Sequence, residues 1–304
     1  MRILQVALGE QRDIEKAFKT IGEVYYWDWS GYDSFRFNNE IVSITESFAP
    51  DVIFLHIQHP GILLPEVAKH ISKKAFVINW TGDVRHPLPE WYKEIGKCID
   101  ISLFSNMNDV KEMRSLGINS DYLQIGFPTD IFKPDGTTMP NHPEIVFMGA
   151  NNGQYPLSPM RAEMVRFLEH HYYNNFIVYG SGWGEHRKWL NQQQEAAAYR
   201  SAKIGINISH FEYERYSSDR NLRLLGSGCM CLSHHYPAIE SEFEVGSHLD
   251  TWRTLYELKN KIDHYLANDK ERKKIAAAGS KYVHDNCTWI NRIEQLKPMI
   301  KIKG

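Results

Sequence analysis

The chain has 304 residues, enough for two domains of ordinary size that can each bury a core. Its composition, 42% hydrophobic and 24% charged, is that of a globular protein, and its net charge of -2 excludes a generally basic nucleic-acid binder. No apolar run approaches the ~20 residues of a transmembrane segment, and MRILQVALGE is too soon interrupted by charge for a signal peptide. The cysteines lack CxxC spacing, which predicts reduced thiols in a cytoplasmic protein.

Strands and helices alternate through the first 125 residues. We predict strands at 3–8, 51–56, 75–80, 101–105 and 121–125, and helices at 13–21, 38–49, 64–72, 90–97 and 109–116. Residues 25–37, YYWDWSGYDSFRF, have no clean period and predict an irregular loop near a cleft. Because each parallel crossover needs a helix, the alternation indicates an α/β fold with a doubly wound parallel sheet.

A break follows at 127–144, where four prolines and a glycine predict an interdomain linker. The pattern then restarts, with strands predicted at 145–148, 175–179, 204–208 and 229–232, and helices at 159–170, 195–201, 221–225, 255–266, 270–282 and 288–300. We therefore expect two domains, 1–130 and 140–287, facing a cleft. The terminal helix, 288–304, is expected to cross back to the first domain.

The stretch 217–243, SSDRNLRLLGSGCMCLSHHYPAIESEF, joins a capped helix start to a short buried strand. In open α/β sheets, helix N-termini at strand ends offer N–H groups and partial positive charge to anions. Three arginines, Arg215, Arg220 and Arg223, lie beside this helix in the sequence. The pattern predicts a site for phosphates, most simply those of a nucleoside diphosphate. The alternative is ordinary helix capping with solvated arginines.

Four groups of motifs follow one another along nearly the whole chain. They are PDVIFLHIQ with VINWTGDVR, SDYLQIGFPTDIFKP with IVFMGANNG, FIVYGSGW with the stretch 217–243, and IAAAGSKYVHDNCTWINRI. Together they resemble nucleotide-sugar glycosyltransferases of the GT-B fold, in the group with a spore-maturation-protein-like (CgeB-like) carboxyl-terminal domain. The resemblance implies two Rossmann-like domains, the first holding the acceptor and the second holding a nucleotide-sugar donor, which we expect to be a UDP-sugar.

The resemblance also implies a set of donor-binding positions. These are Gly149, Asn151, Asn152, Tyr179, Gly180, Gly182, Arg215, Ser218, Asp219, Arg220, Asn221 and Arg223. Many retaining members carry glutamates where this chain has Arg215 and Arg223, and an arginine pairs with phosphate but cannot accept a hydroxyl hydrogen bond. Glu212 or Glu214 is an alternative source of the lost carboxylate, and the stereochemical outcome stays open. The absence of a DxD motif predicts an enzyme that needs no metal ion, and no tightly bound cofactor is expected.

Two residues are catalytic candidates. Asp83 follows a strand and a glycine, where its carboxylate could take the acceptor's proton or orient the acceptor; simple helix capping is an equal alternative. His210 follows the strand at 204–208 and could contact the sugar or its phosphate, although a lone histidine there is more often structural. On the acceptor side we place Gly9, Trp27, His59 and Arg85.

The acceptor itself stays open. A hydroxymethylated DNA base, a polysaccharide, a protein and a lipid-linked sugar are all compatible with the resemblance. A DNA-binding groove in the first domain would use the basic residues Lys16, Lys19, Arg36, Arg85 and Lys93. Because these residues are spread along the sequence, the alternative is that they are ordinary solvent-exposed charges. The rival functions are a sugar-nucleotide epimerase or hydrolase on the same frame and a non-catalytic sugar-nucleotide sensor.

Overall fold

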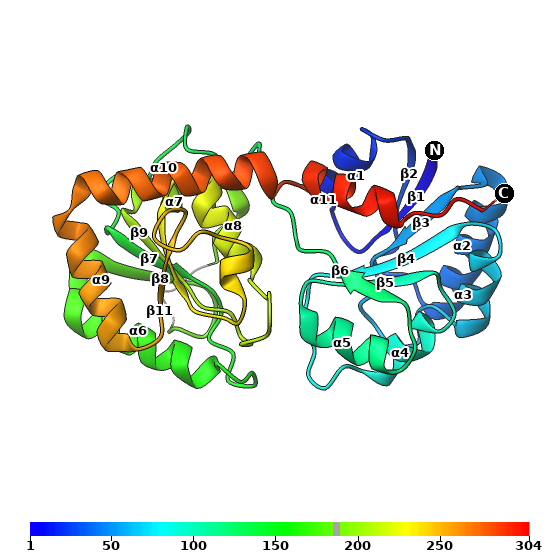
Figure 1. Ribbon diagram of the computed structural model, residues 1–304, viewed down its shortest axis with the longest axis horizontal. Coiled ribbons are helices and arrows are strands. Elements are labelled where there is room, and N and C mark those ends of the chain that lie inside the picture. The colour runs from blue at the N-terminus through cyan, green and yellow to red at the C-terminus, as the bar shows by residue number, and fades with distance from the viewer. Residues whose placement is uncertain (185–188, 304) are drawn as a thin grey trace. The chain divides into compact units, whose positions relative to one another are not determined.

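The computed structural model describes residues 1–184 and 189–303. The chain forms two compact units (Figure 1). Unit 1 combines Met1–Ile125 with Trp289–Gly304, and unit 2 is Gly126–Thr288. The last helix of the chain therefore belongs to the same unit as the first strand, and the two termini lie in that unit (Figure 1).

Unit 1 is built on a parallel sheet with the strand order β2-β1-β3-β4-β5-β6. Its strands are β1 (Arg2–Ala7), β2 (Glu23–Asp28), β3 (Val52–Leu55), β4 (Phe76–Thr81), β5 (Ile101–Phe104) and β6 (Ser120–Tyr122). Its helices are α1 (Arg12–Phe18), α2 (Ser34–Phe48), α3 (Pro65–Ser72), α4 (Glu90–Gly96), α5 (Met107–Ser115) and α11 (Trp289–Leu296), which is followed by the short η3 (Lys297–Met299).

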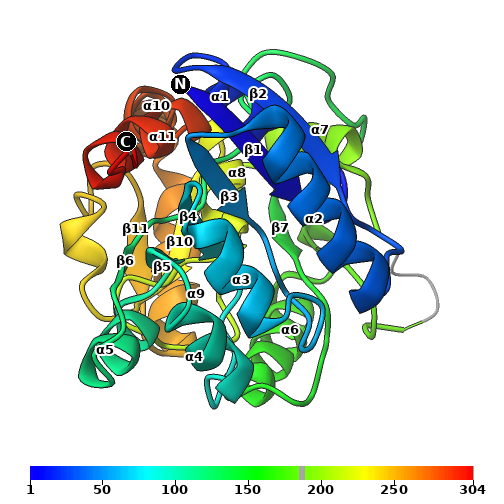
Figure 2. The same cartoon turned by 90° about the vertical axis from the view of Figure 1, so that its right-hand side faces the viewer.

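Both faces of this sheet are buried, which explains why its central strands are mostly apolar. One face packs against α2 and α3 through a core that includes Phe37 and Ile41. The other face packs against α1 and α11, which lie side by side (Figures 1 and 2). On α11, Trp289, Ile293 and Leu296 are buried in this second core. The terminal helix is thus a structural part of unit 1.

Unit 2 is built on a second parallel sheet, with the order β11-β10-β9-β7-β8 in the described residues. Its strands are β7 (Ile145–Met148), β8 (Phe176–Tyr179), β9 (Ile204–Asn207), β10 (Met230–His234) and β11 (Asp250–Trp252). Its helices are α6 (Ser158–Tyr172), η1 (Tyr173–Asn175), α7 (Gln192–Ser201), α8 (Asp219–Gly226), η2 (Ile239–Ser241), α9 (Leu255–Ala267) and α10 (Asp269–Asn286).

The helices of unit 2 also cover both faces of the sheet. On one face α6 and α9 surround a core that includes Phe147 and Leu168. On the other face α7, α8 and α10 bury Tyr199, Leu224 and Val283 (Figure 1). Two doubly wound, wholly parallel α/β units confirm the predicted fold class. None of the helices in the described part of the chain has the length and apolar character to span a bilayer.

One prediction about local structure was wrong. Residues 25–37 are not an irregular loop, because they contain the end of β2 and the start of α2, with a short turn between them. Some of the aromatic rings in this segment belong to the core: the Trp27 ring stacks on Phe37 at a centroid distance of 5.1 Å, and Trp27 is only 7% exposed. The short edge strand β11 was not predicted.

Candidate functional site

The candidate site lies at the carboxyl end of β7 in unit 2, where Gly149 follows the strand. Two arginines approach this glycine from different helices: Arg161 from the first turn of α6 and Arg220 from the first turn of α8. A Cβ atom added to Gly149 would stand 2.3 Å from Nη2 of Arg161 and 2.8 Å from Nη2 of Arg220. Only glycine leaves both guanidinium groups this close to the backbone, so the strand end forms a cradle lined by two cations.

Arg161 is only 1% exposed. Its Nη1 lies 2.5 Å from Nε2 of His210, and its guanidinium stands 5.3 Å from the centre of the Phe147 ring. Its Nε and Nη2 atoms are buried and have no hydrogen-bond partner among the described residues. Burial and the neighbouring charge of Arg220 lower the pKa of Arg161 to about 9. A buried cation with two unsatisfied donors is costly, and its cost falls when an anion binds.

Arg220 is held by one edge of its guanidinium group. Its Nη1 donates to Asn207 Oδ1 (3.1 Å), to the Ile208 carbonyl (3.0 Å) and to Ser218 Oγ (3.2 Å). Its guanidinium lies 5.1 Å from the Phe147 ring, so the two arginines share this aromatic support. Neither arginine has a carboxylate within ion-pair distance in the part of the chain that the structure describes. The cradle therefore carries two positive charges without a counter-charge.

The loop after β7 is fixed to the loop after β8 by backbone hydrogen bonds. Gly149 N donates to the Tyr179 carbonyl (2.9 Å), and Asn151 N donates to the Ser181 carbonyl (2.8 Å). The two loops can approach this closely because Gly180 and Gly182 have no side chain. A Cβ atom at Gly180 would stand 2.4 Å from the Gly149 carbonyl oxygen, and one at Gly182 would stand 2.6 Å from the Asn151 carbonyl oxygen. The predicted donor positions in these two loops are thus brought together.

The Tyr179 ring lies nearly parallel to His142 at a centroid distance of 6.0 Å. Asn152 accepts a short hydrogen bond from Ser158 Oγ through its carbonyl oxygen, which ties the β7 loop to the start of α6. This tie connects the loop of Gly149 with the helix that carries Arg161.

The start of α8 differs from the predicted capping pattern. Ser218 is the N-cap residue, but its side chain makes no capping hydrogen bond and donates instead to Asn207 Oδ1 (3.2 Å) at the end of β9. Asn221 is fully buried, and its Oδ1 accepts a hydrogen bond from the Cys231 thiol. Ser218 and Asn221 thus contact the neighbouring strands β9 and β10. The positive charge that α8 places beside Gly149 is that of Arg220.

The other two predicted phosphate-binding arginines are already paired. Nη1 of Arg223 lies 3.0 Å from Glu195 Oε2, and its Nη2 lies 2.6 Å from Asp219 Oδ2. Nη2 of Arg215 lies 3.8 Å from Glu242 Oε1, and the Arg215 backbone is in the left-handed region with φ of 57°. Their charges are therefore balanced by the protein itself, unlike those of Arg161 and Arg220.

The acceptor-side candidates and Asp83 lie in unit 1. Asp83 is exposed in the loop after β4, and its backbone N–H donates to Thr81 Oγ1 (3.2 Å). Arg85 donates from Nη2 to Gln58 Oε1 (2.9 Å). His59 is exposed beside Trp29, whereas Trp27 is a core residue and presents little surface.

The backbone groups of Gly9, another acceptor-side candidate, are hydrogen-bonded within the protein. Its N–H donates to Asp28 Oδ1 (3.0 Å) and Ser30 Oγ (2.8 Å), and its carbonyl accepts from the Tyr26 hydroxyl (2.8 Å). Both of its polar backbone groups are therefore satisfied within unit 1.

The sequence reasoning missed Arg161. A signal was present, because Arg161, Met164, Val165 and Leu168 follow the spacing of one buried helix face. An arginine on such an apolar stripe is unusual, since arginines are seldom fully buried without a partner. Trp183 was also missed; its Nε1 donates to the Gly149 carbonyl (2.6 Å) and thereby fixes the floor of the cradle.

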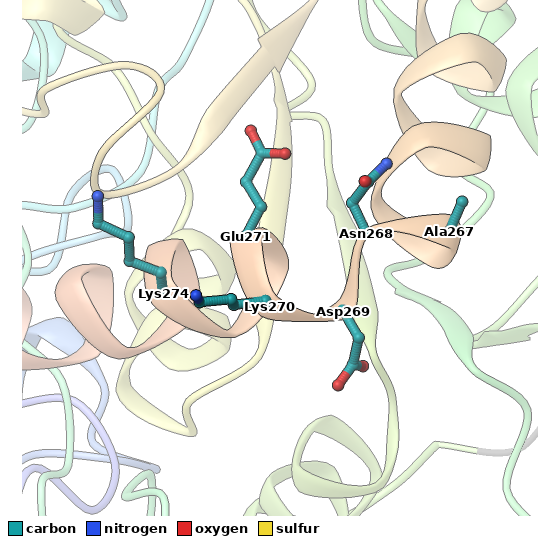
Figure 3. A pocket seen from close by; sticks show the side chains of 6 residues that line it. All are labelled: Ala267, Asn268, Asp269, Lys270, Glu271 and Lys274. Atoms are coloured by element: carbon teal, nitrogen blue, oxygen red, sulfur yellow. The ribbon is translucent and has the colours of Figure 1, made fainter.

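A separate hollow of about 610 Å³ lies at the junction of α9 and α10 (Figure 3). Figure 3 shows its carboxylates, Asp269 and Glu271, pointing to opposite sides of the chain. Asp269 pairs with Lys273 (2.7 Å) and Glu271 with His264 (2.8 Å), so neither faces an open ligand position. Among the described residues, no group of three or more His, Cys, Asp or Glu side chains is arranged to hold a metal ion.

Comparison with known proteins places this geometry in a family context. Residues 161–297 match the family model described as "Glycosyl transferase-like". No curated protein sequence matches the chain.

Three solved structures are similar over nearly their whole length. HepE of Anabaena, in complex with UDP and glucose, is 11% identical, with a TM-score of 0.67 and 98% of each chain covered. Sucrose-phosphate synthase of Thermosynechococcus elongatus is 10% identical, with a TM-score of 0.67 and 98% of each chain covered. A glycosyltransferase of Rickettsia africae is 13% identical, with a TM-score of 0.65, covering 98% of this chain and 97% of that one. The chain therefore has the GT-B glycosyltransferase fold.

Proposed function

We propose that the chain is a glycosyltransferase that binds a nucleotide-sugar donor, expected to be a UDP-sugar, at the Gly149 cradle of unit 2. The observation that carries this proposal is the pair of guanidinium groups without counter-charge, one of them fully buried. A diphosphate supplies the missing negative charge and accepts paired hydrogen bonds from arginine. The HepE structure in complex with UDP and glucose supports the same ligand class.

The same two arginines give the cradle a role in the reaction. When the bond from the anomeric carbon to the phosphate breaks, the departing nucleoside diphosphate gains negative charge. Arg161 and Arg220 would stabilise that charge more in the transition state than in the bound donor. We therefore propose that the reaction needs no metal ion, because fixed guanidinium groups stabilise the leaving group.

The acceptor is proposed to bind to unit 1, with Asp83 as the candidate base. Its carboxylate belongs to an exposed residue at the carboxyl edge of the sheet, where an acceptor hydroxyl could reach it. Two acceptor classes are proposed for testing: a hydroxymethylated DNA base and a surface glycan. The CgeB-like subgroup and a cytoplasmic location belong to the same proposal.

The first experiment measures donor binding to the wild type and to Arg161→Met. UDP and UDP-glucose are titrated by calorimetry, in the presence of magnesium and in the presence of a chelator. We expect binding to the wild type under both conditions and a loss of affinity of at least ~10-fold in the variant. Without ligand, Arg161→Met should be as stable as the wild type or more stable, since it replaces an unpaired buried charge by an apolar side chain.

Arg166→Met is the matched control, because Arg166 lies on the same helix but is exposed. It should bind UDP like the wild type. A wild type that binds neither ligand, or an Arg161→Met variant with unchanged affinity, would remove the proposed donor site.

Product analysis then separates the proposed transferase from its rivals. UDP-glucose is incubated with the protein alone, with hydroxymethylated duplex DNA and with oligosaccharide acceptors. Transfer of glucose to one acceptor class supports the proposal and identifies the acceptor. Free glucose alone indicates a hydrolase, an isomerised sugar nucleotide indicates an epimerase, and binding without any product indicates a sensor.

A further inference from the structure

His210 lies in the loop that follows β9 and contacts the buried arginine of the cradle. Its Nε2 atom is 2.5 Å from Nη1 of Arg161. A guanidinium group has only donors, so the imidazole must accept this hydrogen bond through an unprotonated Nε2. The ring proton of the neutral imidazole is therefore on Nδ1, which lies 3.5 Å from Ser158 Oγ.

The surroundings of His210 hold the ring in place. Its backbone carbonyl accepts a hydrogen bond from Leu157 N (3.0 Å), immediately before α6. The Tyr155 ring packs against the imidazole at a centroid distance of 4.5 Å. Both Tyr155 and Leu157 belong to the loop that leads from Gly149 to Arg161. The histidine thus connects the loop that follows β9 with the helix that carries the arginine.

The contact decides which edge of the Arg161 guanidinium is left without a hydrogen-bond partner. His210 occupies Nη1, while Nε and Nη2 are the two atoms that have no partner among the described residues. In arginine, Nε–H and the adjacent Nη2–H point in the same direction and form a fork that matches two oxygens of a phosphate. Nε and Nη2 are therefore both left for a phosphate only when the protein's own hydrogen bond is made to Nη1.

We propose that His210 is a positioning residue, which accepts from Nη1 of Arg161 and so turns the Nε and Nη2 fork of this arginine toward the diphosphate. This role rests on the proposed function of the cradle and differs from a catalytic role, because His210 acts through Arg161. Burial and the charges of Arg161 and Arg220 lower the pKa of His210 to about 3, so its Nε2 lone pair persists at neutral pH. The titratable and charged groups around the ring are Arg161 and Arg220 from α6 and α8, with the uncharged Tyr155 and Ser158 on its other side.

The experiment compares two substitutions by titration with UDP and with uridine. His210→Leu keeps an apolar side chain of similar size but cannot accept, and it should weaken UDP binding ~10-fold or more while leaving uridine binding within ~3-fold. His210→Gln provides an acceptor oxygen and should restore most of the UDP affinity. His171→Leu, on the exposed end of α6, is the control and should have no effect.

A second measurement is independent of any ligand. Nitrogen NMR of the His210 ring should show an unprotonated Nε2 and a protonated Nδ1 from pH 5 to pH 8. A ring that titrates near pH 6.5, or UDP affinity that is unchanged in His210→Leu, overturns the inference. If the wild type binds no nucleotide, the proposed function fails. The titrations are then repeated with inorganic pyrophosphate, and a wild type that does not bind it overturns the positioning role as well.

Discussion

Glu195 of α7 accepts a hydrogen bond of 3.0 Å from Nη1 of Arg223 of α8, and both side chains are largely buried. Burial raises the pKa of Glu195, an effect that Arg223 opposes through its charge. The pair joins two helices on the same face of the sheet in unit 2. We therefore expect Arg223 to act as a structural residue in place of the phosphate contact that its position in the sequence predicts.

The first prediction follows from this pair. Arg223→Leu should lower the free energy of unfolding by about 3 kcal/mol at pH 8, because it leaves the Glu195 carboxylate buried without its charged partner. Loss of the arginine raises the pKa of Glu195 further, so the deficit should be smaller at pH 5 than at pH 8, because protonation of the carboxyl group removes the unpaired charge. Urea denaturation at both pH values measures the effect, and UDP affinity should stay within ~3-fold of the wild type.

The double variant Arg223→Leu with Glu195→Leu is the control for this prediction. It removes both charges and should recover most of the lost stability, since a hydrophobic pair often replaces a buried ion pair at little cost. A stable single variant that no longer binds UDP would show instead that Arg223 contacts the donor.

The second prediction concerns the space at Gly149. Gly149→Ala places a methyl group 2.3 Å from Nη2 of Arg161, well inside van der Waals contact, and must displace the guanidinium group. We expect UDP affinity to fall at least ~10-fold, about 1.4 kcal/mol, as measured by calorimetry. Gly153→Ala is a matched control in the same loop, because a Cβ there meets no atom within 4 Å. Equal affinities in the two variants would show that the cradle does not hold the ligand.

The third prediction is a pH dependence in unit 1. Asp109 is only 3% exposed, and burial raises its pKa to about 6, while a hydrogen bond of 2.7 Å from Asn106 opposes the shift. The pKa of Asp109 is higher in the folded state than in the unfolded state, so the protonated carboxyl group stabilises the fold. This contribution is fully present below pH 4 and is lost as the pH rises through 6.

Asp109→Asn keeps the shape and the contact with Asn106 but cannot ionise. The variant should be more stable than the wild type at pH 7.5 by up to about 3 kcal/mol, and the difference should vanish near pH 4. Urea denaturation across this range checks the sign. A variant that is less stable than the wild type at pH 7.5 would mean that the ionised carboxylate is the form that the fold prefers.

Much of the fold could be predicted from the sequence because the buried strands are mostly apolar. The strand at 145–148 was predicted with the bounds of β7, Ile145–Met148. The edge strand β2 was missed because its residues alternate between exposed positions and positions that are half-buried or buried. Clusters of aromatic residues also occur in loops. The three-residue β11 is too short to leave a periodic signal.

The site was only partly predictable, because its charges are balanced by residues that are distant in the sequence. The sequence places Arg220 and Arg223 three residues apart and does not distinguish them. The fold pairs Arg223 with Glu195, 28 residues earlier, and leaves Arg220 beside Gly149 without a carboxylate. Likewise, the burial of Arg161 and its contact with His210, 49 residues later, depend on the packing of α6 against the sheet.

The last prediction concerns α11, the helix that returns the chain to unit 1. Ile293 is 0% exposed in the core that α11 shares with α1, whereas Ile290 on the same helix is 50% exposed. Ile293→Ala should cost about 3 kcal/mol of the stability of unit 1, and Ile290→Ala should cost less than ~1 kcal/mol. Because two units can unfold separately, hydrogen exchange of the β1 and β3 amides is the suitable measurement, with the β7 and β9 amides as an internal reference. Protection should fall in unit 1 alone; equal losses in both units would mean that the helix stabilises the whole chain rather than the sheet it covers.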